Sequence, residues 1–206
     1  MLSTSRAILY SPTMTFADTA TWVGKGWNQN GTNQYQFTVP QDPALAFVGK
    51  PGETYYMAPK SVQGSLDPVW MGFGADTGLP VDDFRDNIAS LDLLSVDGPG
   101  EIEMFDYRSG PGGLQRFFGT TGGAPHSAWL TSGTHTHIYT VFSKPGRYEL
   151  TYQTSARGKD GSLITSKPTT TSIQVGGQRP ADEKRLPSKS ALTRLPLVMP
   201  ARRITA

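Results

Sequence analysis

The sequence lacks cysteine altogether, which excludes disulfide bonds, thiolate metal ligands and a cysteine nucleophile. Charge is scarce as well, since only 17% of the 206 residues are Asp, Glu, Lys or Arg. No stretch approaches the roughly 18 consecutive apolar residues of a membrane-spanning helix, so no membrane span is predicted. The first sixteen residues contain one arginine and no apolar run of about 7–15 residues, so we expect no secretory signal there.

Glycine and proline are abundant, with 23 and 16 residues, and they predict many turns. Between them lie short segments with strand character, at 35–39, 54–58, 90–96, 101–108, 114–120, 135–142, 147–156 and 169–175. In the segment RYELTYQTSA the alternation is clean, and the side chains predicted to share one face are Tyr148, Leu150, Tyr152 and Thr154. Strands at this density predict an all-β antiparallel sandwich.

Two connections carry more specific signals. Asp97-Gly98 has the chemistry of a tight turn, so the segments 90–96 and 101–108 on either side of it are predicted to form a β-hairpin. The best helical pattern is LPVDDFRDNIASLDLL (79–94), in which Asp82 is the predicted N-cap. Because this pattern runs into the strand-like LDLLSV, we expect a helix of two turns at most.

Four blocks of sequence occur in a distinctive order: DPALAFVGKPGETYYMAP (42–59), DPVWMGFGADTGLP (67–80), SVDGPGEIEMFDY (95–107) and GTHTHIYTVFSKPGRYELTYQTSARGKDGS (133–162). Together they resemble the repeat domain of actinobacterial surface-anchored proteins of the choice-of-anchor M type. The resemblance covers about two thirds of the chain and implies an Ig-like fold. The chain departs from that family at Tyr139-Thr140, where Asn-Trp is usual, and we expect it to lack the family's export signal and anchor.

The predicted organisation has three parts. Residues 1–33 form an N-terminal segment with edge strands, 34–177 an Ig-like antiparallel β-sandwich, and 178–206 a basic, proline-rich C-terminal arm. From Arg179 onward, the 28 residues include seven basic residues, two acidic residues and four prolines. Such a segment is predicted to be extended.

The C-terminal arm has three interpretations. It is a solvated linker, a nucleic-acid-binding tail, or an arm that docks on a partner protein. The arm has no aromatic residue to stack on bases, so nucleic acid is not the predicted partner. We favour docking, in which apolar side chains between prolines lie on a partner and basic ones pair with its acids. The predicted partner-binding residues are Arg185, Lys189, Leu192, Arg194, Leu195, Leu197, Arg202 and Arg203.

All three histidines fall within one short stretch, at His126, His135 and His137. On a strand, side chains two residues apart share a face, so His135 and His137 are expected to lie about 7 Å apart on the same side. One interpretation is a zinc site, with His126 or Asp160 as a third ligand. The other is that the histidines serve only the architecture of the strand. No other cofactor is predicted.

Catalysis has no support in the motifs. The G-x-S-x-G signature of a serine nucleophile is absent, and RSGPGG (108–113) lacks the lysine of a phosphate-binding loop. We therefore predict that the protein is not an enzyme. Trp22 and Trp27, which lie among Gly and Asn residues, are candidates for a contact surface.

Taken together, these features predict a non-enzymatic structural or surface-display protein. The first choice is a component of an actinobacteriophage virion, such as a decoration, head or tail protein. Its partners would be other protein subunits in a multicopy assembly, and neither nucleic acid nor a membrane. The alternative is a cell-envelope surface protein of an actinobacterium that binds a metal or a host ligand. A second alternative is a carbohydrate-binding module.

Overall fold

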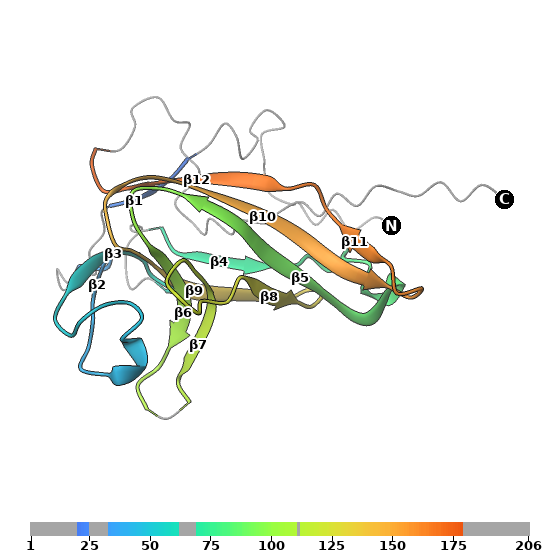
Figure 1. Ribbon diagram of the computed structural model, residues 1–206, viewed down its shortest axis with the longest axis horizontal. Helices are drawn as coiled ribbons and strands as arrows, with labels where there is room; N and C mark the ends of the chain where they lie inside the picture. Colours follow the sequence, from blue (N-terminus) through green and yellow to red (C-terminus); the bar gives the residue numbers. More distant parts are fainter. Residues whose placement is uncertain (1–19, 25–32, 62–68, 111, 179–206) are drawn as a thin grey trace, which may run out of the picture.

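The computed structural model describes residues 20–24, 33–61, 69–110 and 112–178, which form two β-sheets packed face to face (Figure 1). The strands of the first sheet are β1 (Ala20–Val23), β5 (Phe84–Asp97), β8 (Ser127–Leu130), β10 (Gly146–Gly158), β11 (Leu163–Thr165) and β12 (Thr169–Val175). The strands of the second sheet are β2 (Gln36–Thr38), β3 (Thr54–Ala58), β4 (Met71–Gly74), β6 (Ile102–Tyr107), β7 (Leu114–Gly119) and β9 (His135–Phe142). The connections include two 3-10 helices, η2 (Pro43–Leu45) and η3 (Val81–Asp83).

The first sheet has the order β1-β12-β10-β5-β8, with β11 also paired to β10. The second has the order β2-β3-β9-β6-β7, with β4 also paired to β9. The pairings are antiparallel except for β1 and β12, which run parallel. The prediction of an all-β sandwich is therefore confirmed. None of the helices among the described residues is long and apolar enough to cross a membrane.

The core lies between the sheets and is built by alternation along the strands. In β10, the four residues predicted to share a face, Tyr148, Leu150, Tyr152 and Thr154, are all buried, as predicted. In β9, Ile138 and Phe142 point into the same core. Because the sandwich has one inner face per sheet, every second residue of these strands is free to face outward.

The helix expected within 79–94, of two turns at most, is a single 3-10 turn in the structure. Only η3 is helical, Asp82 does not cap it, and β5 begins directly after it at Phe84. Phe84 is buried in the core, and Asn87 adopts a positive φ of 52° in the irregular start of the strand. Asn tolerates this conformation better than most residues, so the chain can bulge there and then resume a regular strand.

The predicted hairpin around Asp97-Gly98 is also wrong, because β5 and β6 belong to different sheets. The turn instead carries the chain across one end of the sandwich. A side chain at Gly98 would collide with the ring of Tyr148, so the crossing needs a glycine at this point. The link from β9 to β10 crosses beside it, and Ser143 and Glu101 exchange two hydrogen bonds of 2.9 and 2.7 Å between the two links.

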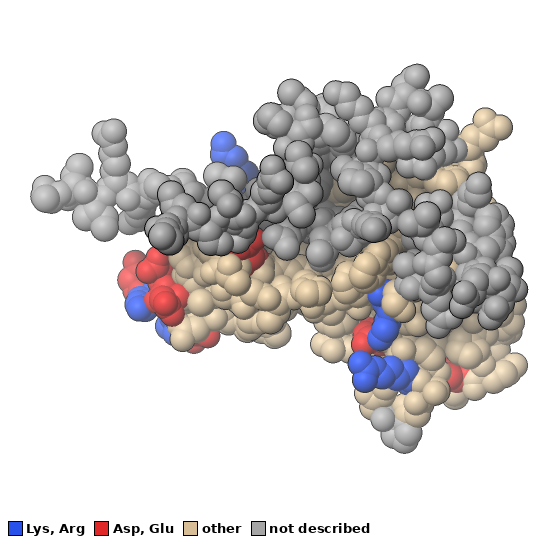
Figure 2. Space-filling model, turned by 180° about the vertical axis from the view of Figure 1, so that it is seen from behind, with Lys and Arg blue, Asp and Glu red and all other residues tan. Residues whose placement is uncertain are grey.

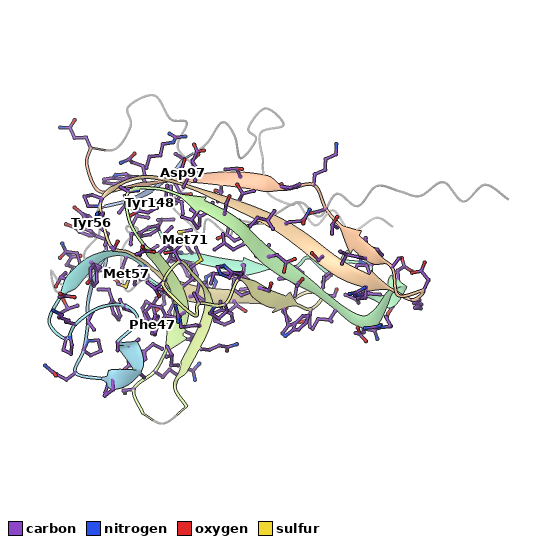
Figure 3. The ribbon with its side chains drawn as sticks, viewed as in Figure 1. Phe47, Tyr56, Met57, Met71, Asp97 and Tyr148 are labelled. Carbon is purple, nitrogen blue, oxygen red and sulfur yellow. The ribbon has the colours of Figure 1, made fainter. Side chains whose placement is uncertain are left out.

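A second, smaller apolar cluster covers part of the outer face of the second sheet. Its buried members are Val39, Leu45, Met57, Phe105 and Val141. The connection between β2 and β3, which contains η2, closes over it and is tied down by a 2.8 Å hydrogen bond from the Tyr107 hydroxyl to Asp42. Figure 3 labels Met57 and Phe47 of this outer cluster, and Met71 and Tyr148 of the core between the sheets.

Candidate functional site

The two neighbouring histidines of β9 lie on the outer face of the second sheet. Because Ile138 points into the core, His135 and His137 point away from it. The N-terminal half of β9 pairs with β4, and the register sets Gly72 opposite His137 and Gly74 opposite His135. The predicted shared face of the two histidines is therefore what the structure shows.

The glycines opposite the histidines are required by the close approach of the two strands. A Cβ atom at Gly72 would collide with the carbonyl oxygen of Thr136, and one at Gly74 would collide with that of Thr134. Each imidazole thus lies opposite a residue without a side chain, and the two strands can approach closely only because these residues are glycines.

Trp70 completes the arrangement by stacking on His137. The ring centroids of Trp70 and His137 are 4.0 Å apart with an angle of 22° between the planes. The rings of His135 and His137 are 5.3 Å apart and nearly perpendicular, at 79°. The sequence analysis did not connect Trp70 with the histidines, because only the pairing of β4 with β9 brings them together.

Burial lowers the pKa of His137 below its usual range, and the nearby His135 lowers it further. The backbone of Met71 acts in the opposite direction, yet the Nδ1 atom of His137 is buried without a hydrogen-bond partner. The ring is therefore neutral at neutral pH, which is the form in which imidazole donates a lone pair to a metal ion.

The third predicted ligand does not join the pair. His126 precedes β8 in the first sheet, where its carbonyl oxygen accepts a 2.7 Å hydrogen bond from the Leu93 amide. Asp160 lies in the turn between β10 and β11 and accepts hydrogen bonds from the backbone and hydroxyl of Ser162. Among the described residues, no group of three or more His, Asp or Glu side chains is placed to hold a metal ion.

The lowered pKa of His137 predicts a pH-dependent stability. Between the folded pKa and about 6.5, the unfolded chain binds more protons than the folded one, so stability falls as the pH drops through this window. We expect the melting temperature to fall more for the natural chain than for His137→Gln when the pH is lowered from about 7.5 to about 5.5. Equal falls, measured by circular dichroism in matched buffers, would show that His137 is not the group responsible.

Trp22, a predicted contact residue, is half-buried and bonded within the sandwich, and its role as a contact residue stays a prediction. Its Nε1–H donates a 3.1 Å hydrogen bond to the carbonyl oxygen of Gly176, while the Gly176 amide donates a 2.6 Å bond to Val23. Trp27 and the predicted partner-binding residues lie outside the described residues; these are Arg185, Lys189, Leu192, Arg194, Leu195, Leu197, Arg202 and Arg203.

Trp129 is a surface aromatic that the sequence analysis missed. It lies on β8, a strand that was not predicted, and 74% of it is exposed. The signal was present in the alternation of SAWL, in which Ala128 and Leu130 are buried while Ser127 and Trp129 face outward. On the face shown in Figure 2, the charged side chains of the described residues form small separate groups.

Comparison with known proteins does not assign a family: no family model, no curated protein and no solved structure matches the chain.

Proposed function

We propose that the protein is a non-enzymatic structural subunit, whose β-sandwich is attached to other subunits of a multicopy assembly by its C-terminal arm. The assembly proposed first is the virion of an actinobacteriophage, in which the protein serves as a decoration, head or tail component. The alternative is the surface of an actinobacterial cell.

The observation that supports this proposal is the fixation of the chain where the arm begins. Gly176 is held from two sides, by the indole of Trp22 and by the backbone of Val23, and β1 and β12 run parallel up to this point. A segment that starts from a rigid point has a restricted reach, so less conformational freedom is lost when it binds a partner.

The composition of the arm adds chemical support. From Arg179 onward, basic residues outnumber acidic ones by seven to two. Leu195 directly precedes Pro196, and Leu197 and Val198 lie between Pro196 and Pro200. Arginine and apolar residues are typical of the central contacts of protein interfaces, and proline lowers the entropy that a free segment loses on docking.

The test is native mass spectrometry with size-exclusion chromatography. The full chain is expected to form oligomers, and a chain that ends at Gly177 is expected to remain monomeric with an unchanged circular dichroism spectrum. A full-length variant with Arg185, Lys189, Arg194, Arg202 and Arg203 changed to Glu separates charge from length and is expected to be monomeric as well. A full chain that is monomeric, or a shortened chain that assembles equally well, would contradict the proposal.

A separate experiment distinguishes a virion from a cell surface as the location of the assembly. Antibodies raised against the sandwich are expected to label purified phage particles in electron micrographs. Labelling of intact actinobacterial cells in the absence of phage would favour the alternative.

A second candidate function is the binding of a divalent transition metal by His135 and His137. Their ring separation of 5.3 Å suits two imidazoles that share one ion, and the unpartnered Nδ1 of His137 is a donor atom without another use. Isothermal titration with Zn²⁺ is expected to show one ion per chain, lost in both His135→Gln and His137→Gln. His126→Gln is the matched control, and equal loss in that variant would contradict this assignment.

A further inference from the structure

The outer face of the first sheet combines an exposed tryptophan with a set of hydroxyl groups. Trp129 on β8 is 74% exposed and is the direct cross-strand neighbour of Ser90 on β5. Ser90 in turn lies opposite Ser155 on β10. An indole exposed to this extent on a regular strand contributes little to the core, and tryptophan is one of the residues enriched where proteins bind their partners.

The hydroxyls beside Trp129 converge on one carboxylate, that of Asp92. Ser127 Oγ donates to Asp92 Oδ1 at 2.6 Å, and Ser90 Oγ donates to Asp92 Oδ2 at 3.2 Å. Ser155 Oγ donates to the same Oδ2 atom, and Ser90 Oγ also lies 3.5 Å from the Ser155 carbonyl oxygen. The four residues come from three adjacent strands, so the sheet holds them in place.

This network decides which hydrogen bonds the surface offers to a ligand. Each of the three serine protons is directed at Asp92, so the remaining lone pairs of the hydroxyl oxygens are left as acceptors. Ser127 is exposed, and Ser90, Asp92 and Ser155 are half-buried, so these acceptors are within reach of solvent. The surface therefore suits a ligand that is rich in hydrogen-bond donors and has an apolar face for the indole.

We propose that Trp129, together with Ser90, Asp92, Ser127 and Ser155, forms a binding site for a neutral carbohydrate. A pyranose ring presents C–H groups on its face, which pack on an indole, and hydroxyl groups at its rim, which donate to the serine oxygens and Asp92. An arginine side chain fits less well, because a bidentate ion pair needs both carboxylate oxygens and those of Asp92 already accept three hydroxyl bonds.

The proposed carbohydrate site is independent of the C-terminal arm. It lies on β8, β5 and β10, whereas the arm follows Gly176 at the end of β12. The two proposals therefore depend on different residues of the chain. Failure of one proposal leaves the other standing, since one depends on assembly and the other on ligand binding.

The test is fluorine NMR on the full chain labelled with fluorotryptophan, in which the resonance of Trp129 is identified by its loss in Trp129→Phe. The labelled protein has 4 tryptophans, so three resonances act as internal controls. The probes are cellohexaose, maltohexaose and chitohexaose, titrated separately. We expect at least one of them to shift the Trp129 resonance in a saturable manner and to leave the other three in place.

Variants separate the ring from the hydroxyls. Trp129→Ala is expected to weaken binding about tenfold or more, and Ser90→Ala and Ser155→Ala several-fold each. Leu163→Ala is the matched control, because Leu163 is 62% exposed on the same sheet but lies outside the hydroxyl network, and its binding should be unchanged. Because most of Trp129 is exposed, its replacement should leave the circular dichroism spectrum intact.

Three results would overturn the carbohydrate assignment. The first is the absence of a shift with all three hexasaccharides. The second is a shift in which Trp129→Ala and Ser90→Ala bind as tightly as the natural chain. The third is a shift of the Trp129 resonance by choline or by an arginine-rich peptide and by none of the saccharides, which would identify a site for a cation.

Discussion

Replacing Phe142 with alanine is expected to lower the free energy of unfolding by about 4 kcal/mol, one of the two largest effects that we predict for a single substitution. Phe142 is completely buried, and its cross-strand neighbours are Tyr56 on β3 and Ile102 on β6. Its ring lies 5.1 Å from that of Tyr148, which comes from the opposite sheet. Alanine would leave a cavity where the two sheets are in contact, and these strands cannot close it without losing their register.

Urea unfolding followed by tryptophan fluorescence measures the effect of Phe142→Ala. Leu94→Ala is the control, because Leu94 is 50% exposed at a bulge of β5 and its loss should change stability by about 0.5 kcal/mol or less. A cost below about 1 kcal/mol for Phe142→Ala would mean that this part of the core is not packed as described.

Replacing Glu103 with alanine is expected to lower the free energy of unfolding by about 3 kcal/mol, because it leaves the largely buried guanidinium of Arg116 without its ionic partner. The side chain of Glu103 is 4% exposed and that of Arg116 16% exposed, and their closest N···O distance is 2.7 Å. Glu103 also accepts hydrogen bonds from the backbone and hydroxyl of Thr121. Arg116 in turn lies 4.1 Å above the ring of Phe47, so the ion pair helps to hold the connection between β2 and β3.

The exposed ion pair of Arg147 and Glu149 provides a control with the same chemistry. Its side chains are 55% and 47% exposed, and the N···O distance is 3.4 Å. Glu149→Ala should change stability by about 0.5 kcal/mol or less, because solvent already screens the pair. Equal losses of stability for Glu103→Ala and Glu149→Ala would show that the pair of Glu103 and Arg116 is no more buried than the exposed pair.

Several parts of the fold were predictable because they depend on neighbours in sequence. Alternation in β10 identified the four residues that face the core, and the spacing of His135 and His137 identified their shared face. The same approach was wrong about Asp82 as a helix cap, because the acidic residues there resemble a helix start but Phe84, Leu91 and Leu93 are needed in the core. Local propensity there is outweighed by burial in the sandwich.

The sequence by itself determined the fold class, the alternation along the strands and the positions of most turns, because each follows from the conformations open to short segments. Only the tertiary structure decided that the Asp97-Gly98 turn joins two sheets, that Trp70 stacks on His137, and that Ser127 and Ser155 meet at Asp92. These contacts join residues that are distant in the chain, and their partners are selected by the packing of two whole sheets. A glycine that permits a hairpin also permits a crossing, so the choice between them depends on the energy of the completed core.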